Sequence, residues 1–183
     1  PPEPHRPAST LRAAPGRPEA APISVPYHRT DNEWLVASVD RARHSVGDGG
    51  GPFGAFIVQA GVELGRGVNR VTRDNDPTAH AEVCAIRAAC VRKGDFSLAG
   101  ATLYTSCEPC PLCLSASLWA RVERVLYAAD RYDAARGGFD DLELYELFAR
   151  DRSEWSTSVA GVVVPEAASP FDAWLASSER VAY

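Results

Sequence analysis

Three cysteines and one histidine of this sequence have the types and spacings that bind a transition metal. Cys107, Cys110 and Cys113 lie in the segment TSCEPCPLC, where two C-x-x-C pairs share Cys110. His80 lies upstream in the segment DPTAHAE, two residues before Glu82. Imidazole nitrogen and thiolate sulfur are good zinc ligands. These residues leave three hypotheses open, namely a dithiol redox motif, a closed structural zinc site and a reactive zinc site.

The elements expected around the two motifs favour the reactive site. Apolar residues at helical spacing predict a helix over 79–93, which begins next to His80 and Glu82. A strand is expected over 101–105, and Pro111 suits the first position of the helix that follows the cysteines. Two helix N-termini that converge on one spot favour thiolates through their dipoles.

The combined pattern H-x-E…P-C-x-x-C is the signature of zinc-dependent nucleobase deaminases. It predicts one zinc ion per chain, held by His80, Cys110 and Cys113, with water in the fourth position. Zinc lowers the pKa of such a water to about 7. Glu82 would then carry protons as general acid and base. A closed site that also uses Cys107 is the alternative, although Cys107 lies at a strand end and need not share the helical turn.

The remaining apolar patterns alternate between helix and strand along the chain. They predict helices and strands at 33–46, 53–58, 62–68, 111–119, 122–129, 140–150, 158–164 and 170–181. The segment 72–78 is expected to be a loop because it is rich in Asn, Asp and Pro. This alternation is typical of a three-layer α/β/α domain with a mixed sheet.

Composition divides the chain into a tail at 1–30 and a domain at 31–183. The tail holds 8 of the 14 prolines and four arginines, and it shows no hydrophobic period, so we expect it to be disordered. The domain carries 15 basic and 22 acidic residues, a net charge of −7, which argues against a nucleic-acid partner. No apolar run is long enough to span a membrane, and no secretory signal is recognisable, so a cytoplasmic location with reduced thiols is expected.

Over residues 31–183 the sequence resembles the cytidine-deaminase-like superfamily and, within it, the short guanine deaminases of bacterial type. The H-x-E and P-C-x-x-C motifs are common to the superfamily. GFDD, SPF-x-AW and the terminal tyrosine narrow the resemblance to the guanine deaminases. The segments that carry it are GGPFGAFIV (50–58), NDPTAHAEV (75–83), AIRAAC (85–90), YTSCEPCPLC (104–113), WAR (119–121), YAADRYDAARGGFDD (127–141) and SPFDAW (169–174). The Pro/Arg-rich tail is a departure from the short family members.

The resemblance implies a cytidine-deaminase-like fold with a central mixed sheet of five strands between helices. It also implies a domain-swapped homodimer in which the C-terminal segment lies over the partner's active site. Tyr183, with its free carboxylate, would seal the substrate pocket.

The same resemblance implies which residues bind the substrate. Asn69 and Asp141 would hydrogen-bond the edges of a purine, while Phe53 and Trp119 would form the walls around its ring. The backbone amides of Ala81 and Cys110 would position the substrate and the bound water. Taken singly, each of these residues also has an ordinary structural role, such as a turn asparagine, a helix cap or a core aromatic.

The implied activity is the hydrolysis of guanine to xanthine and ammonia. Three alternatives stay open at the level of sequence. The substrate is instead guanosine or another aminopurine or aminotriazine, or the chain is a tRNA adenosine deaminase, or it is a zinc-binding domain without catalysis. The acidic domain disfavours the tRNA substrate.

Overall fold

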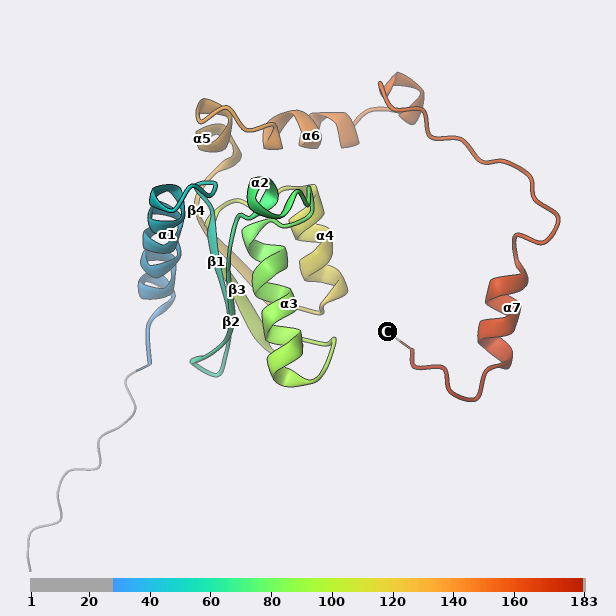
Figure 1. Ribbon diagram of the computed structural model, residues 1–183, viewed down its shortest axis with the longest axis horizontal. Coiled ribbons are helices and arrows are strands. Elements are labelled where there is room, and N and C mark those ends of the chain that lie inside the picture. Colours follow the sequence, from blue (N-terminus) through green and yellow to red (C-terminus); the bar gives the residue numbers. More distant parts are fainter. Residues whose placement is uncertain (1–27, 183) are drawn as a thin grey trace, which may run out of the picture.

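The computed structural model describes residues 28–182, so most of the expected tail and Tyr183 lie outside the described residues. Figure 1 shows the described elements and their labels. In chain order they are α1 (Asp31–Gly47), β1 (Gly54–Gln59), β2 (Val62–Val68), α2 (Val71–Asp74), α3 (Ala81–Lys93), β3 (Ala101–Cys107), α4 (Pro111–Trp119), β4 (Arg124–Ala129), α5 (Arg131–Arg136), α6 (Asp141–Phe148), the 3₁₀ turn η1 (Arg152–Glu154) and α7 (Ser169–Ala176). No helix among them has the length and apolar character needed to cross a membrane.

The four strands form one mixed sheet in the order β2-β1-β3-β4. β1 is antiparallel to both β2 and β3, whereas β3 and β4 are parallel. Helix α1 covers one face of this sheet, and α3 and α4 cover the other (Figure 1). The three-layer α/β/α arrangement expected from the sequence is therefore confirmed.

Strand β1 lies in the middle of these layers, which explains its continuous apolar sequence. Because successive side chains of a strand point to opposite faces, Ala55 and Ile57 pack in the cluster that includes α3, while Phe56 packs with Trp34 of α1. The ring centroids of Trp34 and Phe56 are 5.5 Å apart, and those of Trp34 and Tyr104 are 6.0 Å apart. Burial on both faces fixes the register of β1, which begins directly after the cavity residue Phe53.

The fifth strand expected at 158–164 does not form within the described chain. The β-branched residues of this segment are exposed to solvent, with 84% of Val162 and 96% of Val163 accessible. A strand needs a neighbouring edge to satisfy its backbone groups, and these valines pair with no strand between residues 28 and 182. Their β-propensity alone therefore misled the prediction.

Two short helices were not expected from the pattern. Helix α2 overlaps the start of the segment predicted to be a loop, and α5 begins two residues after the end of β4. Asp130 caps α5 and forms a capping box with Asp133. Elements of four and six residues are too short for hydrophobic periodicity to reveal them.

Helix α3 lies unusually close to strand β2 because two glycines of the strand face it. A Cβ atom added at Gly65 would lie 2.5 Å from both the Ala85 oxygen and the Ala89 nitrogen. One added at Gly67 would overlap the carbonyl oxygen of Ala81, in the first turn of the helix. The position of that first turn, next to His80 and Glu82, therefore depends on the absence of a side chain at Gly67.

We expect Gly67→Ala to destabilise the protein by about 1–3 kcal/mol, because the added methyl group overlaps backbone that cannot move without shifting α3. Gly47→Ala is the matched control, since nothing lies within 4 Å of its added Cβ. Urea unfolding of both variants measures the difference. Equal unfolding midpoints for the two variants would contradict the close packing described here.

Candidate active site

The N-termini of α3 and α4 supply the candidate metal ligands. His80 is the N-cap of α3 and Cys110 is the N-cap of α4, both with extended backbone. Neither side chain makes the capping hydrogen bond that Ser, Thr, Asp or Asn makes at this position. Cys113 follows one turn into α4, after Pro111 has started the helix. The two helix starts therefore present side chains suited to a metal rather than to capping.

The three side chains converge within bonding distance of a common point. The Nδ1 atom of His80 lies 3.6 Å from the Cys110 sulfur and 3.4 Å from the Cys113 sulfur. All three ligand atoms lie within 4.8 Å of one another. Sulfur and nitrogen ligands of one tetrahedral zinc ion lie roughly 3.5 Å apart. The donor types and their separations therefore fit a single zinc ion.

Cys107 lies outside this group of donors. Its thiol donates to the carbonyl oxygen of Asp130 at 3.5 Å, and burial raises its pKa to about 12. Among the described residues, the cluster able to hold a metal contains only His80, Cys110 and Cys113. Three protein ligands leave one tetrahedral position open, which is the arrangement of catalytic zinc sites.

The protonation of the cluster also suits a cation. The pKa of Cys110 is lowered to about 4, because Cys113 and His80 donate hydrogen bonds to its sulfur. The pKa of Cys113 is raised because its thiol makes that bond to Cys110 and is buried. The pKa of His80 is raised by its hydrogen bond to Cys110. A bound zinc ion would favour the thiolate form of both cysteines.

Glu82 lies beside the cluster and is almost wholly buried, with 4% of its surface exposed. Thr105 donates a hydrogen bond to Glu82 Oε1 at 3.0 Å, and the Cys113 sulfur lies 3.4 Å from Oε2. Burial raises the pKa of the carboxyl group, which brings its proton exchange closer to neutral pH. The arrangement suits a proton carrier that is held in one orientation.

Thr105 is a contact that sequence reasoning missed. It lies fully buried in β3, two residues before Cys107, so both side chains lie on the same face of the strand. Its place in the strand that leads into the cysteine segment was the available signal. No local pattern indicates which residue of α3 it meets, because Glu82 lies 23 positions upstream.

A cavity of about 610 Å³ opens in front of Glu82. This volume lies within the range of about 300–1,000 Å³ for small-molecule sites. Its lining includes the expected site residues Phe53, Asn69, His80, Ala81, Glu82, Cys110 and Asp141, together with Glu108, Phe139 and the glycines at 49–51. The fold thus brings to one cavity residues that lie between positions 49 and 141 of the chain.

The aromatic wall of the cavity contains a residue that sequence reasoning missed. The rings of Phe53 and Phe139 meet edge to face, with centroids 4.8 Å apart. Asn69 also lines the cavity, and its Oδ1 accepts a hydrogen bond from the backbone amide of Val71 at 3.2 Å. This bond uses the side-chain oxygen, so the NH₂ group is the part that can donate to a ligand. The pKa of Asp141 is raised by partial burial and by the negative charge of Cys110.

Among the described residues predicted to bind substrate, Trp119 does not line the cavity. Trp119 ends α4, away from the cysteines, and is 62% exposed. It borders a separate apolar hollow that is lined also by Ile86, Phe96 and Val181. Tyr183 lies outside the described residues. The roles of both in substrate binding stay predictions.

The fold and the site together define a class. Residues 28–129 match the family described as the cytidine and deoxycytidylate deaminase zinc-binding region, and the chain belongs to this family. It is 49% identical over 142 residues to the guanine deaminase of Bacillus subtilis, covering 77% of this chain and 91% of that protein.

Solved structures and other relatives agree with this assignment. A crystal structure of guanine deaminase from Bacillus subtilis superposes with a TM-score of 0.81 and 45% identity, covering 85% of this chain and 99% of that one. A tRNA-specific adenosine deaminase from Agrobacterium fabrum is 45% identical over a shorter stretch, which covers 43% of this chain and 51% of that protein. The similarity to guanine deaminase thus extends past the zinc-binding region into the C-terminal part of the chain.

We expect Cys113→Ser to lose zinc and Cys107→Ser to retain one zinc per chain, because only the former removes a ligand from the cluster. Metal analysis of the purified variants measures the stoichiometry. Zinc loss from Cys107→Ser that matches the loss from Cys113→Ser would instead support a closed site with four protein ligands.

Proposed function

We propose that the protein hydrolyses guanine to xanthine and ammonia. The observation that carries this proposal is the buried carboxyl group of Glu82, which lies next to three zinc-ligand side chains at a cavity that also contains Asp141. The similarity to guanine deaminase over most of the chain supports guanine over other amino-substituted rings.

The reaction adds water to the carbon that bears the 2-amino group and expels that amine as ammonia. Zinc held by His80, Cys110 and Cys113 supplies the Lewis acid that makes water a nucleophile near neutral pH. Glu82 accepts a proton from the attacking water and delivers it to the adjacent ring nitrogen. It then transfers the second proton to the leaving amine, so one carboxyl group acts as base and as acid. Thr105 holds one oxygen of that carboxyl group throughout.

Recognition of the purine falls to the remaining cavity residues. The Asp141 carboxylate accepts a hydrogen bond from the guanine N1–H group, a donor that adenine lacks. The Asn69 amide donates to an acceptor on the ring edge, and Phe53 contacts the ring face. Backbone amides of Ala81 and Cys110, at the two helix starts, orient the substrate and the water. Phe139 completes the wall beside Phe53.

We expect the wild-type protein to release ammonia from guanine much faster than from guanosine, adenine, cytosine or a tRNA transcript. Glu82→Gln should lower the rate on guanine by at least about 100-fold while zinc stays bound, because the amide cannot carry the proton. Glu143→Gln, on the exposed side of α6, is the matched control. Coupled ammonia measurement and metal analysis test both. If another compound of the panel is turned over faster, that compound and not guanine is the substrate. Near-normal activity of Glu82→Gln would refute proton transfer by Glu82.

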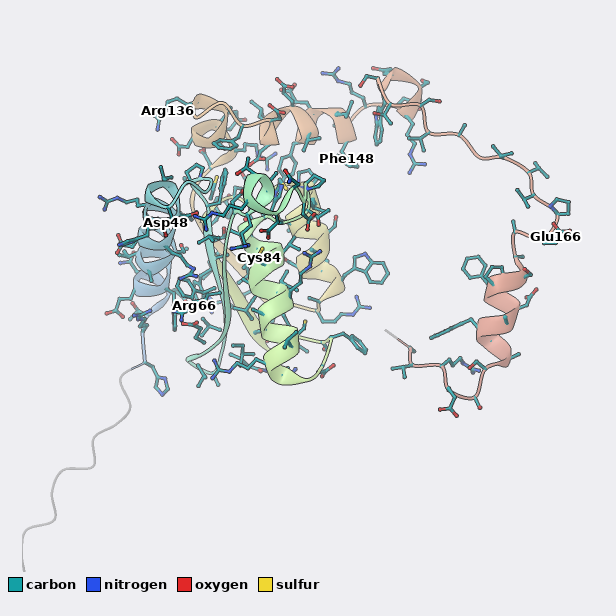
Figure 2. All side chains as sticks on the ribbon, viewed as in Figure 1. Asp48, Arg66, Cys84, Arg136, Phe148 and Glu166 are labelled. Carbon is teal, nitrogen blue, oxygen red and sulfur yellow. The ribbon has the colours of Figure 1, made fainter. Side chains whose placement is uncertain are left out.

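The functional unit that we propose is a cytoplasmic homodimer with exchanged C-terminal segments. After η1 the chain leaves the body, and Glu166 stands apart from it (Figure 2), whereas Val181 borders the hollow beside Trp119. The apolar side chains of this last part of the chain are exposed, including 70% of Phe171 and 65% of Leu175. A second copy of the chain offers the matching apolar surface, since Leu118 and Trp119 of α4 are each 62% exposed. The cytoplasmic location is supported by five free cysteines.

We expect light scattering to give the mass of a dimer. Deletion of residues 181–183 should leave this dimer loaded with zinc and sharply lower activity on guanine, because the end of the chain would no longer exclude water from the partner's cavity. Any activity on guanosine should fall less, since its ribose gains room. Normal guanine turnover by the shortened chain would refute the role of Tyr183 as a lid.

A further inference from the structure

Helix α6 carries Asp141 but has little packing of its own. None of its eight residues is buried. An isolated helix of this length is not stable in water, so tertiary contacts must hold it in place. The position of Asp141 in the cavity therefore depends on a small number of specific contacts between α6 and the rest of the protein.

One such contact joins α6 to the segment that leads into the zinc ligands. Tyr145 lies four residues after Asp141, so both side chains lie on one side of the helix. The Tyr145 hydroxyl donates to the carbonyl oxygen of Pro109 at 2.6 Å. Pro109 immediately precedes Cys110. This hydrogen bond spans 36 positions of the sequence and connects the helix of Asp141 directly to the metal-ligand loop.

An ion pair between Arg131 and Glu108 also contacts this tyrosine. The guanidinium carbon of Arg131 lies 3.5 Å from the centroid of the Tyr145 ring. Arg131 also donates to Glu108 from its backbone amide at 3.1 Å and from Nε at 2.9 Å, and its Nη2 pairs with the other carboxylate oxygen. These bonds hold the guanidinium group of Arg131 over the ring.

We propose that Tyr145, Arg131 and Glu108 form a clamp that sets the position of Asp141 relative to the zinc ligands, and that Tyr145 is a positioning residue for purine recognition. The proposal rests on the proposed function, in which Asp141 reads guanine. Glu108 and Pro109 are the two residues before Cys110, so the clamp fastens α6 to the loop at the point where the ligands begin. A carboxylate displaced from this position would meet the N1–H group poorly while the proton carrier Glu82 stayed in place.

The decisive variant is Tyr145→Phe, which removes one oxygen atom and leaves the ring against Arg131. We expect KM for guanine to rise about three- to tenfold, the effect of one lost hydrogen bond, with kcat changed less and one zinc retained. Arg131→Lys should act in the same direction, because lysine keeps the charge but lacks the planar group that covers the ring. Tyr132→Phe is the control, because it removes the same hydroxyl group one residue from Arg131. The side chain of Tyr132 is 66% exposed.

A double-mutant cycle separates positioning from general stability. In an Asp141→Asn background, where KM is already raised, Tyr145→Phe should raise KM no further, because both changes act through one contact. The same additional rise in both backgrounds would overturn the clamp, as would an unchanged KM in Tyr145→Phe or loss of its zinc.

The two proposals fail in different ways. Absence of guanine turnover by the wild type would refute the proposed function and the clamp with it. An unchanged KM in Asp141→Asn would refute the recognition role of Asp141 and therefore the clamp, while guanine hydrolysis by the wild type would stand. A raised KM in Asp141→Asn together with a normal KM in Tyr145→Phe would refute the clamp alone.

Discussion

The meeting of two helix N-termini at His80 and Cys110 is the constraint on which the rest of the structure depends. Each helix start exposes backbone amides and a positive dipole end, and two of them close together need negative charge between them. The cysteine sulfurs supply part of that charge, and hydrogen bonds from Cys113 and His80 lower the pKa of Cys110. Zinc balances the remaining thiolate charge while accepting the histidine nitrogen. The negative charge of the cysteine ligands thus offsets the positive dipole ends of the two helices.

The sheet keeps these two helix starts together. β3 leads directly into the cysteine loop, and the glycines of β2 allow α3 to lie against the strand. A shift of either helix would separate ligands that come within 3.4–3.6 Å. The same framework buries Glu82 and gives it a hydroxyl partner in Thr105. Burial of the carboxyl group is costly for folding when it is charged, and that cost is the physical origin of its raised pKa.

The parts of the cavity differ in how firmly they are held. On the metal-ligand side Cys110 and Cys113 are buried and His80 is half-buried, whereas Asp141 lies on a helix with no buried residue. This division is consistent with the chemistry proposed for them. The proton transfer proposed for Glu82 would serve any deaminase with H-x-E, while recognition of a particular ring requires residues that differ between them. Helix α6 is attached through a hydrogen bond and an ion pair rather than through buried side chains.

The sequence by itself determined the chemistry and most of the elements. The cluster of His80, Cys110 and Cys113 was expected from the sequence because metal ligation requires particular residue types at short spacings. The same reasoning predicts proton transfer by Glu82. The spacing of apolar residues along the sequence predicted all four strands of the described chain and five of its helices, namely α1, α3, α4, α6 and α7. The three layers followed from the order of those elements.

Only the tertiary structure decided how distant residues meet. Thr105, Phe139 and Tyr145 contact partners 23, 86 and 36 positions away, and no local spacing encodes such pairs. The valines at 162–164 have the composition of a strand, yet none of the described strands pairs with them. Trp119 is a large aromatic residue of the type expected in the wall of a pocket, but it lies at the end of α4 that is far from the cysteines. Residue type and spacing set what a segment can do, whereas the position of its partner depends on how the whole chain packs.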